Sequence, residues 1–196
     1  MASVTRALTH TDAAIIERSW HEPERFAEVF DRYYAEIHGF ATRRLGRTLA
    51  DDVAAETFLI AFHRRGRFDV TRPDARPWLY GIASNLISRH RRTEVRQYRA
   101  MARAGLAQVA DGHAERVAGR IDAEALRGRL AAALAEVADR DRDVLLLVAW
   151  AQLSCEEAAR ALGIPAGTAR SRLHRARRKT RAALGGTDPR IDGEDQ

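Results

Sequence analysis

Apolar residues recur at spacings of three and four along most of the 196-residue chain, which is the period of a helix. The first run extends from Phe26 to Ala41 and predicts an amphipathic helix that ends near Gly46. A second helix is predicted over residues 49–64, with two carboxylates in its first turn, where the helix dipole favours negative charge. A third opens at Pro77, which a first turn tolerates, and is expected to continue through about residue 96. Because no segment alternates with a period of two, the sequence predicts an all-α fold.

Two segments interrupt this pattern. Residues 66–75 are rich in Gly, Asp and Pro and are expected to form a loop. Residues 98–121 are rich in Ala, Arg and Gly and offer few apolar anchors, which favours a flexible linker; Ala and Arg leave helix open as an alternative for its first part. The expected organisation is an N-terminal extension (1–19), a helical domain (20–97), the linker (98–121), a second small helical domain (122–184) and a disordered tail (185–196).

Charge is distributed unevenly along the chain. The net charge of +6 and the isoelectric point near 10.3 favour polyanionic partners without naming one. Residues 20–62 carry eight acids and five Arg, whereas residues 63–103 carry eleven Arg and three acids. A second basic block, residues 166–181, has six Arg, one Lys and no acid. The two basic blocks fall in different predicted domains, which favours contact with nucleic acid at two places.

Several classes of protein are not expected. Cys155 is the only cysteine, so neither an internal disulfide nor a cysteine-based zinc site can form. The longest apolar run, residues 144–151, is far shorter than the roughly 20 residues that a membrane helix needs. Because no targeting segment is recognised either, we expect a cytoplasmic protein with no direct membrane insertion. No H-E-x-x-H, P-loop or G-x-S-x-G pattern occurs, and we expect neither an enzyme nor a bound metal or cofactor.

The second domain has the pattern of a helix-turn-helix. Ala159 is small where two helices must approach closely, and Gly163 permits the positive φ of the turn four residues later. Ser154 followed by Glu157 predicts a capping box for the first of these helices. The helices expected in this domain cover residues 122–138, 140–150, 155–162 and 166–184.

The last of these helices has two different faces. At 100° per residue, one face carries the small and apolar residues Ala169, Leu173, Ala176 and Thr180. The opposite face carries cations and no acid, which favours DNA over a merely solvated surface, where both signs of charge normally mix. Since the first turns of such a helix enter the major groove, the residues expected to read base edges are Arg170, Ser171, His174 and Arg175. Further DNA contacts are expected from Thr168, Arg172 and Arg178.

The first domain has two candidate surfaces. On the second predicted helix, Asp52, Glu56, Leu59 and His63 form one stripe. An acidic stripe with an exposed Leu would repel phosphates and is typical of a protein-binding face, although a solvated face with a scattered apolar residue fits the spacing equally well. On the third predicted helix, small, polar and cationic residues share the face that a nucleic acid backbone can approach, namely Gly81, Ser84, Asn85, Ser88, Arg91 and Arg92.

Three motifs together resemble a known family. They are LADDVAAETFLIAFHR and RPWLYGIASNLISRHRR in the first half and RDRDVLLLVAWAQLSCEEAARALGIPAGTARSRLHRARR in the second. Their order and spacing resemble a bacterial RNA polymerase sigma factor of the extracytoplasmic-function type. Such a protein joins a promoter-melting domain to a C-terminal helix-turn-helix. The resemblance covers most of residues 20–184 and departs from the family pattern at Gly81, where an Arg is common, and at Ala169, where a Val is usual.

The resemblance also implies roles and partners. Asp52 and Glu56 match the acidic helix that docks on core RNA polymerase. The loop 68–75, which begins with Phe68 and Asp69, and Asn85 match the elements that capture a flipped base of the −10 element of promoter DNA. The first turns of the last helix match the residues that read the −35 element. An anti-sigma factor is a further implied partner. The alternative is a stand-alone helix-turn-helix repressor or activator that binds duplex DNA without polymerase.

Overall fold

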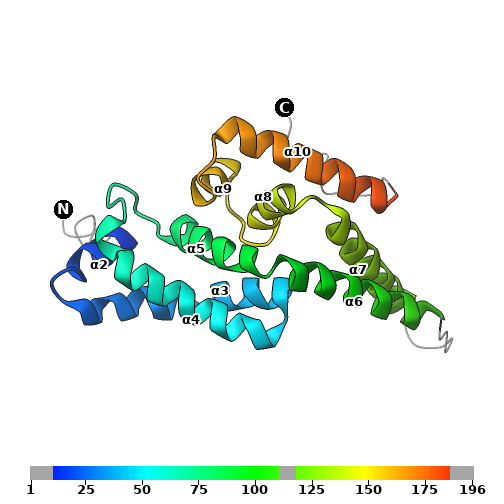
Figure 1. Cartoon of the computed structure of the whole chain (residues 1–196), viewed down its shortest axis with the longest axis horizontal. Coiled ribbons are helices and arrows are strands. Elements are labelled where there is room, and N and C mark those ends of the chain that lie inside the picture. Colours follow the sequence, from blue (N-terminus) through cyan, green and yellow to red (C-terminus); the bar gives the residue numbers. More distant parts are fainter. Residues whose placement is uncertain (1–10, 111–117, 186–196) are drawn as a thin grey trace.

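The computed structural model describes residues 11–110 and 118–185, and within these ranges it is built of helices without a strand (Figure 1). The elements are α2 (Asp12–Arg18), η1 (Pro23–Phe26), α3 (Ala27–Leu45), α4 (Arg47–Arg64), η2 (Arg65–Arg67), α5 (Arg76–Arg89), α6 (Arg91–Ala110), α7 (Ala118–Glu136), α8 (Asp139–Ala149), α9 (Cys155–Ala161) and α10 (Ala166–Ala183). The predicted all-α class is confirmed. Among the described helices, none combines the length and the low polarity needed to cross a lipid bilayer.

The first and third predicted helices begin within one residue of the expected positions, whereas the second begins at Arg47, two residues early. The prediction of two carboxylates in its first turn is therefore wrong, since the first turn of α4 holds no acid. Gly46 separates α3 from α4 with a φ of +81°, a conformation that glycine adopts without a steric penalty. Pro77 lies in the first turn of α5, where its missing N–H costs nothing. Residues 186–196 of the predicted disordered tail and the first ten residues of the N-terminal extension lie outside the described residues.

The third helix is shorter than predicted, since it ends at Arg89 and not near residue 96. His90 leaves the helical region with φ −103° and ψ 23°, and its N–H donates to the Ile87 carbonyl, 2.8 Å away. After this break α6 begins at Arg91, and it continues to Ala110. The helical alternative for the first part of the joining segment is therefore confirmed, and α6 lies beside α7 (Figure 1).

The C-terminal helices form the predicted helix-turn-helix. The Ser154 hydroxyl accepts from the Glu157 N–H, and the Glu157 carboxylate accepts in return from the Ser154 N–H, so the capping box is confirmed. Gly163 has a φ of +63° in the turn between α9 and α10. Ala159 is buried between the helices with a small group of apolar side chains, Val144, Ala169 and Leu173.

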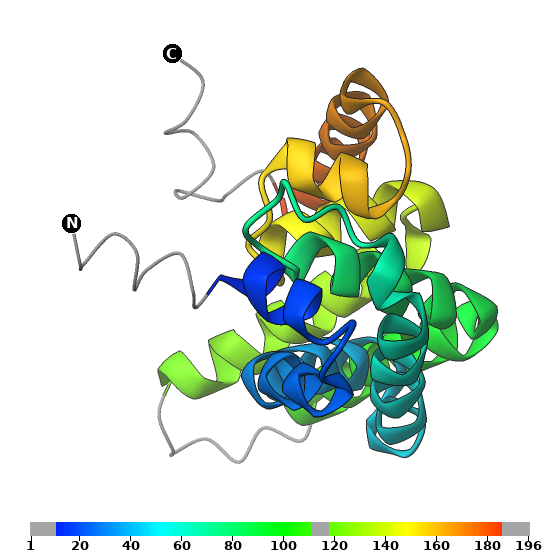
Figure 2. The same ribbon diagram turned by 90° about the vertical axis from the view of Figure 1, so that its left-hand side faces the viewer.

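The two helical domains pack against each other. α5 lies between the remaining N-terminal helices and the C-terminal helices α8, α9 and α10 (Figures 1 and 2). One continuous apolar core runs through both parts, because Leu146, Leu147 and Ala158 belong to the same cluster as Phe40 and Leu79. The two helical domains are thus in direct contact.

Candidate nucleic-acid interface

The two faces of α10 have the predicted burial. Ala169, Leu173, Ala176 and Thr180 are buried against the other C-terminal helices. The predicted base-reading residues Arg170, Ser171, His174 and Arg175 are exposed, as is Arg178, while Thr168 and Arg172 are half-buried. The helix therefore presents a continuous row of hydrogen-bond donors that a phosphate or a base edge can reach.

Two of these arginines are held by carboxylates of neighbouring helices. The Arg175 guanidinium donates two hydrogen bonds to Asp141, of 2.9 and 2.8 Å, and this raises the pKa of Arg175. Arg170 donates to Glu156 on α9 over 3.2 Å. The side chains of Arg170, Glu156 and Arg175 are exposed, whereas that of Asp141 is not. Ion pairs of exposed side chains contribute about 0–1 kcal/mol, so both arginines can exchange their carboxylates for DNA.

The second candidate surface is a cavity of about 600 Å³ beside the loop that precedes α5. Phe68, Trp78 and Asn85 line it, with the rings of Phe68 and Trp78 centred 5.1 Å apart. Arg64 and Arg67 line it from the end of α4 and from η2. Aromatic rings next to guanidinium groups and an amide are suited to a base with its flanking phosphates.

The loop before α5 has its own internal hydrogen bonds. The Asp69 carboxylate accepts from the Thr71 N–H and hydroxyl, at 3.2 and 2.6 Å, and from Arg72 Nε at 3.0 Å. These donors, those of Thr71 above all, lower the pKa of Asp69. The predicted residue Asp69 therefore shapes this loop, and its carboxylate is engaged within it.

Asp12 fixes the far end of the same loop, and the sequence analysis missed it. Its buried carboxylate accepts from the Ala75 N–H at 2.8 Å and from the Tyr33 hydroxyl at 2.6 Å, and it pairs with Arg32. Its own N–H donates to the Pro73 carbonyl. The sequence does contain a signal for the helix that carries Asp12. Thr11 is a typical N-cap residue, and the apolar pair Ile15 and Ile16 follows it.

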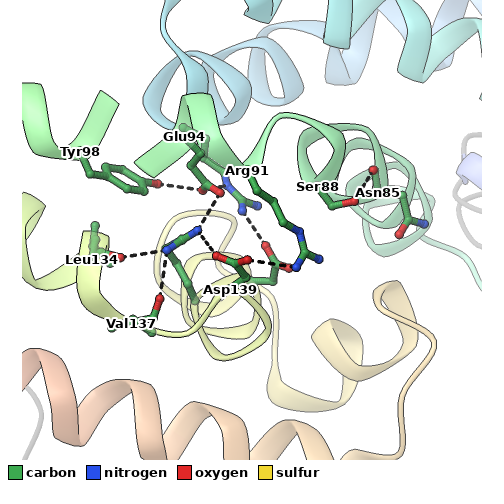
Figure 3. A network of polar contacts seen from close by, with 11 residues as sticks. Asn85, Ser88, Arg91, Glu94, Tyr98, Leu134, Val137 and Asp139 are labelled. Carbon is green, nitrogen blue, oxygen red and sulfur yellow. Dashed lines mark hydrogen bonds and ion pairs between the residues drawn. The ribbon is translucent and has the colours of Figure 1, made fainter. Parts of the chain in front are cut away.

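The predicted residues of the third helix do not form one open face. Asn85 is exposed, and the Ser88 hydroxyl donates to its carbonyl over 2.7 Å (Figure 3). Ser84, by contrast, is only 2% exposed. Beyond the helix break, Arg92 is exposed, whereas Arg91 pairs with Asp139 of α8 at 3.1 Å. The expectation that small residues admit a nucleic acid backbone is unmet here, since the backbone that approaches Gly81 is that of Ala161.

The acidic stripe on α4 faces outward. Asp52, Glu56 and His63 are exposed, and Leu59 is 57% exposed between them. The His63 Nδ1–H donates to the Leu59 carbonyl at 2.8 Å, and Glu56 pairs with Arg89 at 3.2 Å, which leaves both side chains at the surface. Carboxylates around a large exposed apolar residue can dock on a basic protein surface with an apolar contact at its centre.

Comparisons with known proteins match the N-terminal and the C-terminal helices to two different family regions. Residues 29–97 match Sigma-70 region 2, and residues 127–180 match Sigma-70 region 4. The chain is 31% identical over 172 residues to the ECF RNA polymerase sigma factor SigW of Bacillus subtilis, covering 83% of this chain and 90% of SigW. It is 32% identical to the RNA polymerase sigma factor CnrH of Cupriavidus metallidurans, covering 75% of this chain and 82% of that protein.

Two solved structures have the same fold. CnrH in complex with the cytosolic domain of CnrY superimposes with a TM-score of 0.61 and 25% identity, covering 90% of this chain and 99% of that one. The sigma factor RpoE in complex with the anti-sigma factor NepR, from Bartonella quintana, gives a TM-score of 0.55 at 19% identity, covering 81% and 96%. The chain therefore belongs to the extracytoplasmic-function (ECF) family of RNA polymerase sigma factors.

Proposed function

We propose that this sigma factor binds core RNA polymerase and places it at promoters through two separate DNA contacts. The observation that carries the proposal is the division of charge on the surface. α10 and the cavity beside α5 present arginines on two different domains, while α4 presents carboxylates around Leu59. One chain thus has two surfaces for a polyanion and one for a basic protein.

The first DNA contact is the insertion of α10 into the major groove at the −35 element. Arg170 and Arg175 lie in its first turns, where such a helix meets base edges, and each guanidinium can bond both acceptors of a guanine. Ser171 and His174 lie between them and complete the base-reading set. Arg172 and Arg178 neutralise phosphates, which contributes affinity without sequence preference.

The second contact is capture of an unstacked base of the −10 element in the cavity beside α5. Taking a base out of the stack costs a few kcal/mol. Stacking on an aromatic side chain returns about 1–3 kcal/mol per base, and half-buried Trp78 supplies the ring. Phe68, which is only 7% exposed, supports Trp78 through the contact between their rings. Asn85 provides donors and an acceptor for the base edge, and Arg64 and Arg67 face the flanking phosphates. Binding at this cavity therefore favours strand separation.

The third contact is made by the acidic stripe of α4 with core polymerase. Reversing two of its charges, Asp52→Arg with Glu56→Arg, is expected to weaken core binding by at least about 30-fold, because like charges placed opposite each other cost several kcal/mol. Titration of labelled sigma factor with purified core enzyme measures this. The matched control is Glu24→Arg, which changes an exposed acid of η1 outside the stripe.

The same variants test the function as a whole. Wild type with core enzyme is expected to start transcripts at defined sites on genomic fragments, and the Asp52→Arg, Glu56→Arg variant is not. Unchanged core affinity in that variant, or specific duplex binding without any core enzyme, would instead favour a stand-alone helix-turn-helix regulator. An anti-sigma factor is a further partner in this proposal, supported by the RpoE and NepR complex, whose fold this chain shares.

Asp12 gives a prediction about the −10 loop. Asp12→Ala removes the acceptor of the Ala75 N–H and of the Tyr33 hydroxyl, so we expect the free energy of unfolding to fall by about 2 kcal/mol. The loop end also loses its anchor, so strand opening at a mapped promoter, followed by permanganate reactivity, is expected to slow while core affinity is unchanged. Tyr33→Phe keeps the Ala75 contact and should leave opening near the wild-type rate; equal slowing in both variants would contradict this role.

A further inference from the structure

The exposed side of α6 carries a row of arginines. They recur at spacings of four, three and four residues, and at 100° per residue they fall within an arc of about 60°: Arg92, Arg96, Arg99 and Arg103. All of them are exposed, and together they are called the α6 arginine row below. At a rise of 1.5 Å per residue the row is about 16 Å long. This helix joins the two domains, and no role has been given to its surface so far.

Buried groups on the other side of α6 fix the direction in which the row points. That side consists of Glu94, Tyr98 and Ala102, which are all buried. The Glu94 carboxylate accepts from Arg44 of α3 at 2.6 Å, from Arg142 of α8 at 3.1 Å, and from the Tyr98 hydroxyl (Figure 3). Arg44 also donates to Asp143 of α8 at 2.6 Å. This buried network holds α6 in place, so the row points away from the core.

The α6 arginine row lacks the features of a protein-binding surface. The one acid of α6, Glu94, is buried on the other side. Ala100 and Ala104 flank the row on one edge and half-buried Val95 on the other, while exposed Met101 lies about 170° away around the helix. Protein interfaces are centred on large apolar residues, whereas phosphates need only cations. The row therefore fits a nucleic acid backbone better than a protein.

The length of the row suits the backbone of duplex DNA. Each strand carries one phosphate per about 3.4 Å of helix axis, so a row of about 16 Å passes about five phosphates of one strand. Among the described residues, Arg92, Arg96 and Arg103 have no ion-pair partner. Arg99 lies 4.0 Å from Glu136 of α7, and both side chains are more than 60% exposed. Ion pairs between exposed side chains contribute little, so Arg99 can exchange Glu136 for a phosphate.

The row and α10 border the same turn of the chain. Glu136 precedes the turn between α7 and α8, and while its carboxylate faces Arg99, its carbonyl accepts from Lys179 of α10. Asp141, just after the turn, holds Arg175 of the predicted base-reading set. A duplex that lies on α10 therefore has the α6 arginine row beside it, across this turn.

We propose that the α6 arginine row is a further DNA contact, which binds the phosphates of duplex DNA next to the segment that α10 reads. The inference rests on the proposed function, because α10 places the duplex beside the row. Arginine contacts with phosphates carry no information about the bases, so the row adds affinity without sequence preference. Arg99 and Arg103 lie between the two matched family regions, residues 29–97 and 127–180.

Removing two arginines of the row tests the contact. Arg92→Ala with Arg96→Ala leaves α6 intact, because alanine is the best helix former. Each lost phosphate contact lowers the slope of log affinity against log salt by about 0.9, so the slope should fall by about two and the affinity at about 0.1 M salt by at least about tenfold. The matched control is Arg25→Ala with Arg47→Ala, which removes the same charge from exposed positions outside α6, α10 and the cavity.

A second variant keeps both the composition and the net charge. It exchanges two arginines of the row with the alanines that follow them, through Arg99→Ala, Ala100→Arg, Arg103→Ala and Ala104→Arg. The exchange moves two cations by about 100° around the helix, away from the row. Ala100 and Ala104 are exposed, so the new arginines are not buried. A loss of affinity in this variant cannot come from a change in net charge.

The probe is a fluorescein-labelled duplex of about 30 base pairs without promoter elements, which is titrated with the full chain at several salt concentrations and followed by anisotropy. We expect the wild-type slope in the control and a shallower slope in both row variants. Titration with core polymerase should give the wild-type affinity for all of them. Both row variants should also keep their preference for a mapped −35 duplex over a scrambled one, because the row does not read bases.

The contrary results separate this inference from the proposed function. Row variants with the wild-type slope would overturn the inference and leave the role of α10 standing. A loss of core affinity with unchanged duplex binding would also overturn it, and would assign the row to an acidic protein surface. A wild-type chain that binds no duplex even at low salt would count against the row and against the proposed role of α10 together.

Discussion

Arg142→Ala is expected to lower the free energy of unfolding by about 3–5 kcal/mol, the loss typical of a buried ion pair that has lost one partner. Arg142 is fully buried and donates to Glu94, to Asp139 and to two carbonyls at the end of α7 and the turn after it. Without it, the Glu94 carboxylate keeps two partners among the described residues, Arg44 and the Tyr98 hydroxyl, and both carbonyls lose the Arg142 donor. Urea unfolding followed by circular dichroism measures the change.

The control for this prediction is Arg140→Ala. Arg140 lies two residues earlier on α8 and is exposed, so its loss should change stability by no more than about 0.5 kcal/mol. A loss below about 1 kcal/mol in Arg142→Ala would show that water or a rearranged neighbour satisfies Glu94. The buried network would then not be what holds the helices α6 and α8 together.

Helical periodicity was sufficient to predict most of the fold, because a helix that buries one stripe shows it as apolar residues at spacings of three and four. The faces of α10 are the clearest example: Leu173 and Ala176 are buried, and Arg170 is exposed, as a period of 3.6 requires. The turn at Gly163 and the cap at Ser154 followed from local chemistry. Local interactions of this kind are encoded within a few residues and can be found without a structure.

Contacts between distant residues could not be predicted in this way. Arg44 and Asp143 are 99 positions apart, and in a chain so rich in arginine neither has a pattern that marks it as buried. The break at His90 was not predicted either, although Glu94, which follows it on α6, contacts Arg142 of the other domain. The burial of Arg44 and Asp143 depends on contacts between residues far apart in the sequence, which a local pattern does not encode.

The candidate surfaces also differ in how far local sequence patterns could predict them. The stripe of Asp52, Glu56 and Leu59 was predicted from spacing alone, and its exposure is confirmed. The cavity beside α5 was predicted only as a loop with Asn85 nearby, because its shape depends on Asp12 from outside the matched region and on α9 from the other domain. The motifs give a prediction of the residues that contact DNA, and the exposure of those residues depends on how the helices pack.

The role of α10 leads to the second prediction with a large expected effect, the loss of −35 recognition in the double variant Arg170→Ala, Arg175→Ala. A bidentate arginine contact with guanine is worth about 1–3 kcal/mol of discrimination, so removing two should weaken specific binding by roughly 30-fold or more. Stability should change little, because both arginine side chains are exposed and ion pairs of exposed arginines contribute little. Competition between a mapped −35 duplex and a scrambled one, with core enzyme present, measures the discrimination.

Arg178→Ala separates base reading from charge. Arg178 is exposed on the same helix but lies beyond the first turns, where the backbone of the duplex is within reach. Its loss should weaken binding to both duplexes alike and reduce the slope of affinity against salt by about one ion, whereas the double variant should reduce the preference between them. If the double variant kept its preference for the mapped duplex, base reading would lie elsewhere on the protein. The arginines of the first turns would then act only as phosphate contacts.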